Sequence, residues 1–273
     1  MLELFLDRRR RLRNGWWIAL FLVGMAALVV PATVMASSRG QTVGPPLQAL
    51  IVIVVTLALL VVRRESASTV FGRAATWPSG MACGLGVAVL MWGTTAALLW
   101  ATGSVSWRPN DDMAGALAQG LADALAVAVV EELVFRGFIF QRLIAGIGTI
   151  PAQGALALYF TLNHSAGLSQ AGDEKVIAMV NIFLASLLFG AAYLRTRSLA
   201  LPIALHFGLN FVQGTVLGFG VSGNAEAGVL TPVLKGAPSW WTGGAFGLEA
   251  SVPGTVVVVL ALVAFWRWAP RER

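Results

Sequence analysis

The sequence is poor in cysteine and in charge, and it lacks two familiar hydrolase motifs. Its 273 residues include one cysteine, Cys83, and only 12% are charged. One cysteine excludes an intrachain disulfide and a thiolate cluster for zinc or iron–sulfur, so we expect Cys83 to be a small packing residue. H-E-x-x-H and G-x-S-x-G are absent, and with them the usual signatures of helical zinc peptidases and serine hydrolases.

Apolar residues take the place of the missing charge. They make up 57% of the chain, the mean hydropathy is +0.77, and runs of transmembrane length recur. The formal net charge is +6, but the basic residues flank apolar runs instead of gathering on a polar face, so we expect no nucleic-acid partner. The composition predicts an all-α, polytopic membrane protein in contact with lipid.

The apolar runs predict about eight transmembrane helices. The fourth is long enough to be bent, and the second is short for a hydrocarbon core about 30 Å thick. The predicted spans are 16–36, 47–62, 77–101, 114–143, 151–168, 176–194, 199–219 and 252–268.

Lysine and arginine are distributed unevenly among the predicted loops. If the N-terminus is cytoplasmic, the cytoplasmic side receives fourteen of them: Arg8, Arg9, Arg10, Arg11, Arg13, Arg63, Arg64, Arg73, Arg142, Arg195, Arg197, Arg267, Arg271 and Arg273. The opposite side receives four, namely Arg39, Arg108, Lys175 and Lys235. The positive-inside rule therefore predicts that both termini are cytoplasmic. The pattern and the short loops favour the cytoplasmic membrane of a prokaryote.

Three regions are expected along the chain: N-terminal transmembrane helices in 1–113, a polar-residue-bearing core in 114–219, and a non-cytoplasmic loop with the last helix in 220–273. The basic start resembles a signal sequence, but its apolar segment runs on for about twenty residues, and we interpret it as a retained span. Trp240 and Trp241 fit an interfacial aromatic belt in the long loop.

Few ionisable residues fall inside the predicted spans, where a charge costs several kcal/mol and usually marks function. They are Asp123, Glu131, Glu132, Arg136, His164 and His206. The last two are the only histidines of the chain.

Helical spacing separates the roles of these residues. Glu132 and Arg136 are four apart and can form a buried ion pair, whereas Glu131 points about 100° away and keeps its carboxylate free. His206 and Asn210 are also four apart, so an imidazole and an amide face the same side. Together with His164, these groups predict an acid/base site with donors for an oxyanion. One difficulty is depth, because straight helices place His164 and His206 about 10 Å apart along the membrane normal.

Three short motifs occur in a recognisable order. They are "EELVFR" at 131–136, "FTLNH" at 160–164 and "HFGLN" at 206–210. They match E-E-x-x-x-R, F-x-x-x-H and H-x-x-x-N, and the chain resembles the CAAX protease and bacteriocin-processing family of intramembrane glutamic endopeptidases, which includes type II CAAX prenyl endopeptidases. The resemblance covers roughly residues 115–215.

The resemblance implies an intramembrane endopeptidase that cleaves a membrane-associated peptide or protein tail. Glu131 and His164 would activate a water, and His206 and Asn210 would stabilise the oxyanion. Glu132 and Arg136 would support the site, and no cofactor is expected. Relatives by motif trim prenylated tails or are linked to bacteriocin maturation or immunity, so the sequence leaves the substrate open, and it carries no signal for an oligomeric state.

Two alternatives stay open at this point. Glu131, His164 and His206 form a His₂Glu set that zinc accepts, so an intramembrane metalloprotease is one. The other is a non-catalytic scaffold, immunity or transport protein, in which the same polar residues fix helix packing or line a path.

Overall fold

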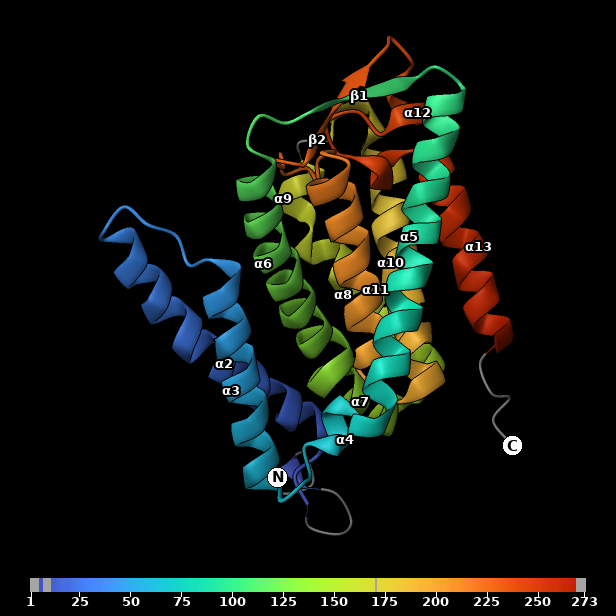
Figure 1. The fold of residues 1–273 in the computed structure, drawn as a ribbon. Helices are drawn as coiled ribbons and strands as arrows, with labels where there is room; N and C mark the ends of the chain where they lie inside the picture. The colour runs from blue at the N-terminus through green and yellow to red at the C-terminus, as the bar shows by residue number, and fades with distance from the viewer. Residues whose placement is uncertain (1–4, 7–10, 170, 269–273) are drawn as a thin grey trace.

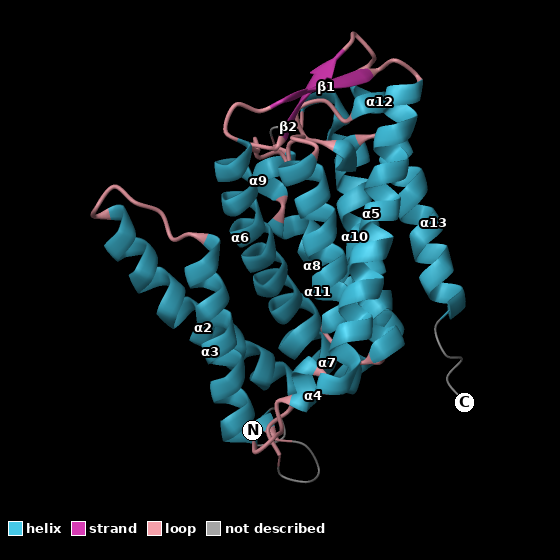
Figure 2. Cartoon of the chain, in the orientation of Figure 1, coloured by secondary structure: helices cyan, strands magenta, loops and turns pink. Residues whose placement is uncertain are grey.

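The computed structural model describes residues 5–6, 11–169 and 171–268, and it shows a bundle of helices with a small sheet at one end (Figures 1 and 2). The predicted basic positions Arg8, Arg9, Arg10, Arg271 and Arg273 lie outside the described residues. The longer helices are α2 (Asn14–Ser37), α3 (Pro45–Arg63), α5 (Trp77–Ala101), α6 (Met113–Glu132), α7 (Ile139–Ile147), α8 (Thr149–Asn163), α10 (Lys175–Thr196), α11 (Ala200–Asn210) and α13 (Val252–Trp268).

Short helical segments connect these helices. The α-helical turns are α4 (Ser68–Phe71), α9 (Ser165–Leu168) and α12 (Ser239–Thr242), and the 3₁₀ turns are η1 (Ala74–Thr76), η3 (Gly172–Glu174) and η5 (Leu248–Ala250). Two π-helical segments, η2 (Leu133–Phe138) and η4 (Phe211–Val216), directly continue α6 and α11.

A helix is present at each of the eight predicted intervals. Within the described residues, five helical stretches are long and apolar enough to cross a membrane: Asn14–Ser37, Pro45–Arg63, Ser68–Ala101, Met113–Ile147 and Gly172–Thr196. Helix α13 is apolar but shorter. The molecule therefore has the helices of a multi-pass membrane protein, while the count of eight spans stays a prediction.

The fourth predicted span is bent, as its length suggested. Asp112 caps the start of α6 by accepting a hydrogen bond of 2.9 Å from the backbone N–H of Gly115. The regular helix ends at Glu132, and the non-helical backbone of Gly137, with ψ of −108°, separates it from α7. The break lies directly beside the motif carboxylates, where π-helical turns often mark functional sites.

Small residues let α5 and α11 approach closely. A Cβ atom added to Gly84 of α5 would lie 2.7 Å from the carbonyl oxygen of Leu201 in α11, and one added to Gly208 of α11 would lie 2.6 Å from the Cβ of Ala88. Such contacts between small residues are a common way to pack membrane helices. They hold α11, which carries His206, against the centre of the bundle.

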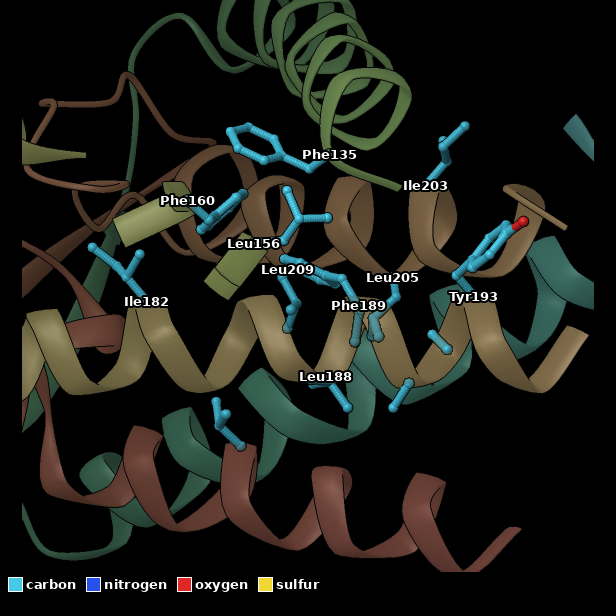
Figure 3. Packing of buried hydrophobic residues seen from close by; sticks show 14 of the residues in the cluster. Phe135, Leu156, Phe160, Ile182, Leu188, Phe189, Tyr193, Ile203, Leu205 and Leu209 are labelled. Atoms are coloured by element: carbon cyan, nitrogen blue, oxygen red, sulfur yellow. The ribbon is translucent and has the colours of Figure 1, made fainter. Parts of the chain in front are cut away.

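Aromatic and aliphatic side chains fill the space between α8, α10 and α11 (Figure 3). Phe160 of α8, Phe189 of α10 and Leu205 of α11 are all buried in this core. Because each lies within a few residues of a motif position or on the facing helix, their packing restricts the orientation of the polar side chains beside them.

The expectation of helices alone was incomplete. Strands β1 (Val105–Pro109) and β2 (Leu230–Leu234) pair antiparallel, with Trp107 opposite Pro232, and lie across the upper end of the bundle (Figure 2). A proline within each strand is typical of an edge, which obscured the strand pattern in the sequence. The indole Nε1 of Trp107 donates to the carbonyl of Leu217 at 3.0 Å and ties the sheet to the end of α11 and η4.

Helix α2 begins and α13 ends toward the same end of the bundle, the lower end in Figure 1. Among the basic residues predicted to be cytoplasmic, Arg63 and Arg142 converge there on Glu65, at 2.6 and 3.5 Å. This arrangement agrees with an even number of crossings, and the cytoplasmic orientation of that end stays a prediction.

Candidate active site

Glu132 and Arg136 form a completely buried ion pair. Their side chains are 0% and 1% exposed, and Arg136 Nη1 lies 3.2 Å from Glu132 Oε1. Nη2 of Arg136 donates to the carbonyl and to the hydroxyl of Ser186 in α10, both at 2.8 Å. The guanidinium thus joins the end of α6 to α10, and the pair expected from the i, i+4 spacing is confirmed.

Glu132 has a second partner that the sequence did not predict. Its Oε1 atom lies 2.9 Å from Nδ1 of His206, across the gap between α6 and α11. The imidazole of His206 also stacks on Phe189, with centroids 4.6 Å apart and planes inclined by 6°. An ionised carboxylate has no proton to donate, so in a bond to it Nδ1 of His206 is the donor. Nε2 is then the nitrogen left for other partners.

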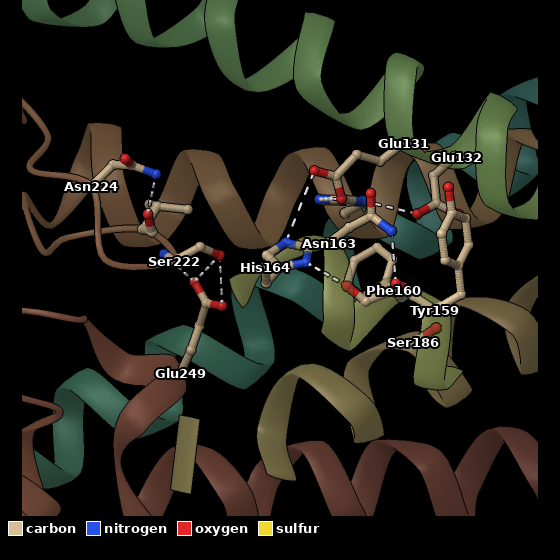
Figure 4. A network of polar contacts seen from close by, with 12 residues as sticks. Glu131, Glu132, Tyr159, Phe160, Asn163, His164, Ser186, Ser222, Asn224 and Glu249 are labelled. Atoms are coloured by element: carbon tan, nitrogen blue, oxygen red, sulfur yellow. Dashed lines mark hydrogen bonds and ion pairs between the residues drawn. The ribbon is translucent and has the colours of Figure 1, made fainter. Parts of the chain in front are cut away.

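The neighbouring carboxylate, Glu131, points toward His164 (Figure 4) and lies near His206 as well. Its Oε1 atom is 4.0 Å from Nε2 of His164, and its Oε2 atom is 3.8 Å from Nε2 of His206. Oε2 has no hydrogen-bond partner among the described residues. These separations exceed a direct hydrogen bond, and a group of the size of water fits in contact with the carboxylate and an imidazole together.

His164 is oriented by its own helix. Its Nδ1 atom lies 2.8 Å from the carbonyl oxygen of Phe160, one turn earlier. A carbonyl only accepts, so Nδ1 is the donor, and in the neutral ring Nε2 is an acceptor directed toward Glu131. Nε2 of His164 and Nε2 of His206 both lie within 4.0 Å of the Glu131 carboxylate, so the predicted difference in depth does not keep the side chains apart.

A cavity of about 530 Å³ contains the predicted catalytic residues. Glu131, His164, His206 and Asn210 all line it. Asp123, two turns before Glu131 on α6, lines it as well and accepts a hydrogen bond of 2.6 Å from Gln119. The four predicted side chains therefore share one space, as convergence of three helices required.

A second polar cluster, outside the motifs, was missed. Glu249 of η5 is half-buried and accepts from the backbone N–H of Ser222 at 3.0 Å and from Nε2 of Gln213 at 3.0 Å. Burial raises the pKa of the Glu249 carboxyl above its ordinary value, although the Ser222 N–H bond opposes this. A small cavity of about 40 Å³ touches Glu249, His164 and Asn210 together. A glutamate in a long loop after the last motif gives no sequence signal of this position.

The same small cavity contains two buried polar atoms without partners. Nε1 of Trp92 and Oδ1 of Asn181 have no hydrogen bond among the described residues, and both side chains line the cavity. The other end of the Asn181 amide donates to the backbone carbonyl of Glu249. The space is large enough for an ordered water, which would satisfy such groups.

The donor set also bears on the zinc alternative. Within the described chain, no group of three or more His, Cys, Asp or Glu side chains is arranged to hold a metal ion. Glu131, His164 and His206 nonetheless supply the oxygen and imidazole donors that zinc accepts, and treatment with a chelator tests whether the protein requires a metal.

One family of known proteins matches a segment of the chain. Residues 113–212 match the family model for type II CAAX prenyl endopeptidases, Rce1-like. This segment includes all four predicted catalytic positions and ends before Ser222 and Glu249, and it confirms the resemblance drawn from the motifs. The match implies a CAAX-type protease in a multi-pass membrane protein. No curated protein and no solved structure matches the chain.

Proposed function

We propose that the protein is an intramembrane endopeptidase of the glutamic type that hydrolyses a peptide bond in a membrane-associated peptide or protein tail. The observation that carries this proposal is the position of Glu131, whose carboxylate has no arginine partner within the described residues and faces two imidazoles inside a large cavity, while the adjacent Glu132 is held by Arg136.

The first step is activation of water by Glu131 and His164. A water about 2.8 Å from the carboxylate and from Nε2 of His164 satisfies both at their observed separation of 4.0 Å. The carboxylate takes the proton as the water oxygen attacks the peptide carbonyl, and the protonated acid then gives a proton to the leaving amine.

The second requirement is stabilisation of the oxyanion. A protonated His206 keeps Nδ1 on Glu132 and donates from Nε2, and the amide of Asn210, one turn further along α11, supplies another donor. Preorganised donors of this kind lower the barrier most where bulk water is excluded. Glu132 and Arg136 act on the reaction only through His206 and the helix end that they hold.

Cleavage of membrane-tethered reporter peptides by the purified protein in lipid tests this function. We expect wild-type cleavage to fall by about 10² or more in His206→Ala and in His164→Ala. Ser165→Ala and Cys83→Ala should retain activity, because neither side chain belongs to the proposed mechanism.

A strong chelator separates the metal alternative. Cleavage that is indifferent to chelator supports the glutamic mechanism. Loss with chelator and recovery with zinc would move the same residues into a metal site. Absence of cleavage by folded wild-type protein across a broad peptide panel would favour a scaffold or transport role.

A further inference from the structure

The cavity continues well beyond the proposed catalytic residues. Along α6 it is lined by Gly120, Asp123 and Ala124 as well as by Glu131, residues that recur on one face of the helix. Asp123 and Glu131 are eight residues apart, which corresponds to about 12 Å along the helix axis. The cavity therefore has the length to hold several residues of an extended peptide.

A second carboxylate, Glu226, lines the same cavity as Asp123. Contacts between small residues bring the two together, because a Cβ on Gly120 would collide with Thr215 of η4 and a Cβ on Gly214 would lie 2.9 Å from Cγ of Glu226. The loop that carries Glu226 thus packs on η4, and η4 packs on α6 one turn from Asp123. Both carboxylates line the cavity.

No basic residue neutralises these two carboxylates within the described part of the chain. The ion pairs formed there by acidic residues involve Glu65, Glu131 and Glu132, and none includes Asp123 or Glu226. Glu226 is exposed at the edge of the cavity, yet desolvation by the neighbouring protein, and after it the negative charge of Asp123, raise its pKa above the ordinary value. A cation between the two groups would relieve this repulsion.

We propose that the cavity selects peptides with a lysine or arginine three or four residues from the cleaved bond, with the cationic side chain placed between Asp123 and Glu226. The spacing follows from the separation of about 12 Å along α6 and a rise of about 3.3 Å per residue in an extended peptide. The inference rests on the proposed function, since it names the substrate class of the same cavity.

Two other substrate classes are disfavoured by the same geometry. An acidic residue at that offset meets two like charges, and an apolar residue leaves both carboxylates without a cationic partner. Basic residues nearer to the cleaved bond meet Glu131 instead, which the proposed chemistry requires to be free.

A peptide scan tests the inference. Reporter peptides with a neutral sequence carry one arginine at each position from five residues before to five after the cleaved bond, and a matched series carries glutamate. We expect kcat/KM to be about tenfold higher for arginine than for glutamate at an offset of three or four on one side of the bond, and near equality elsewhere. The difference should shrink at high salt.

The double substitution Asp123→Asn with Glu226→Gln should abolish the arginine preference, so that kcat/KM for the arginine and glutamate peptides agrees within about twofold. Asp173→Asn, an exposed carboxylate of η3 that does not line the cavity, should keep the preference. Equal rates for arginine and glutamate peptides in the wild type, or a preference unchanged in the double variant, would overturn the inference.

Binding measurements distinguish this inference from the proposed function. The affinity of fluorescent arginine and glutamate peptides for the wild-type protein in lipid nanodiscs is measured beside cleavage. Cleavage without a charge preference contradicts the inference and leaves the protease intact. If the wild type binds arginine peptides selectively, the double variant loses this selectivity and neither cleaves them, the result contradicts the proposed protease function and supports the proposed role of Asp123 and Glu226. Absence of selectivity in both measurements contradicts the inference.

Discussion

The carboxylates at the two ends of the bundle differ in whether they have an arginine partner. At the lower end, Glu65 lies 2.6 Å from Arg63 and 3.5 Å from Arg142, and its hydrogen bond to Arg63 holds its pKa below the ordinary value. At the cavity end, Asp123 and Glu226 have no such partner among the described residues. Glu65 is paired with arginine and stabilises the fold, whereas Asp123 and Glu226 line the cavity without a cationic partner in the described chain.

The same division occurs between two adjacent residues. Glu132 is fully buried and its Oε1 atom has Arg136 and His206 as partners, while Glu131 faces the cavity and has, among the described residues, only the two imidazoles as ion-pair partners within 4.0 Å. A helical step of about 100° is enough to give the two carboxylates different surroundings. Paired and cavity-facing carboxylates therefore occur both at opposite ends of the bundle and within a single turn of helix.

The largest expected effect comes from unpairing the buried carboxylate. In Arg136→Met, Glu132 loses its cation at 3.2 Å and α10 loses the two bonds to Ser186. We expect the free energy of unfolding to fall by about 3–5 kcal/mol, as for other buried ion pairs broken on one side. Chemical unfolding in detergent measures this, and a variant as stable as wild type would contradict the structural role of the pair.

A smaller loss of stability is expected when α11, the helix that carries His206, is pushed away from α5. Gly84→Ala places a methyl group against the backbone of α11, and overpacking of this kind costs about 1–3 kcal/mol. Gly86→Ala is the matched control, because nothing lies within 4 Å of a Cβ at that position. Thermal unfolding should separate the two variants, and equal melting temperatures would contradict the close contact.

Glu249 offers a test by pH at the cavity end. Its folded-state pKa is raised, so its contribution to stability is greatest below the unfolded value and is lost as pH rises through the raised pKa. Glu249→Gln should therefore reduce the difference in melting temperature between pH 5 and pH 8. A variant with the same pH dependence as wild type would show that this carboxyl is not the titrating group.

The smallest effect is expected at the lower end. Glu65 is partly exposed, so Glu65→Gln should reduce the unfolding free energy by less than about 1 kcal/mol. Because the pKa of Glu65 is lowered, its contribution is present above the unfolded value and is lost as pH falls through the folded one. Peptide cleavage should be unchanged, and a large loss of activity would break the distinction between the two ends.

Local spacing made much of the site predictable. Hydropathy located the helices, the i, i+4 rule found the pair of Glu132 and Arg136, and motif order placed Glu131 and His164 in one set. These signals act within one helix or within short motifs. The grouping of the four predicted residues in one cavity agrees with them, and their catalytic roles stay a proposal.

Contacts between distant segments were not predictable in the same way. The bond from His206 to Glu132 joins residues 74 positions apart, and either side chain alone is compatible with other partners. Glu249 lies in a loop without helical periodicity, and Pro109 and Pro232 disguised two strands. Each of these features depends on how helices and loops pack together, which spacing along the chain does not encode.

The most direct test of the account compares Glu131→Gln with Glu132→Gln in one preparation, measuring peptide cleavage and unfolding for both. We predict that Glu131→Gln stays as stable as wild type and loses cleavage by about 10³, because it removes a general base. Glu132→Gln, in contrast, should lower the stability of the protein, because it removes the charge that Arg136 requires. Cleavage retained in a folded Glu131→Gln variant would contradict the assignment of Glu131 to the chemistry.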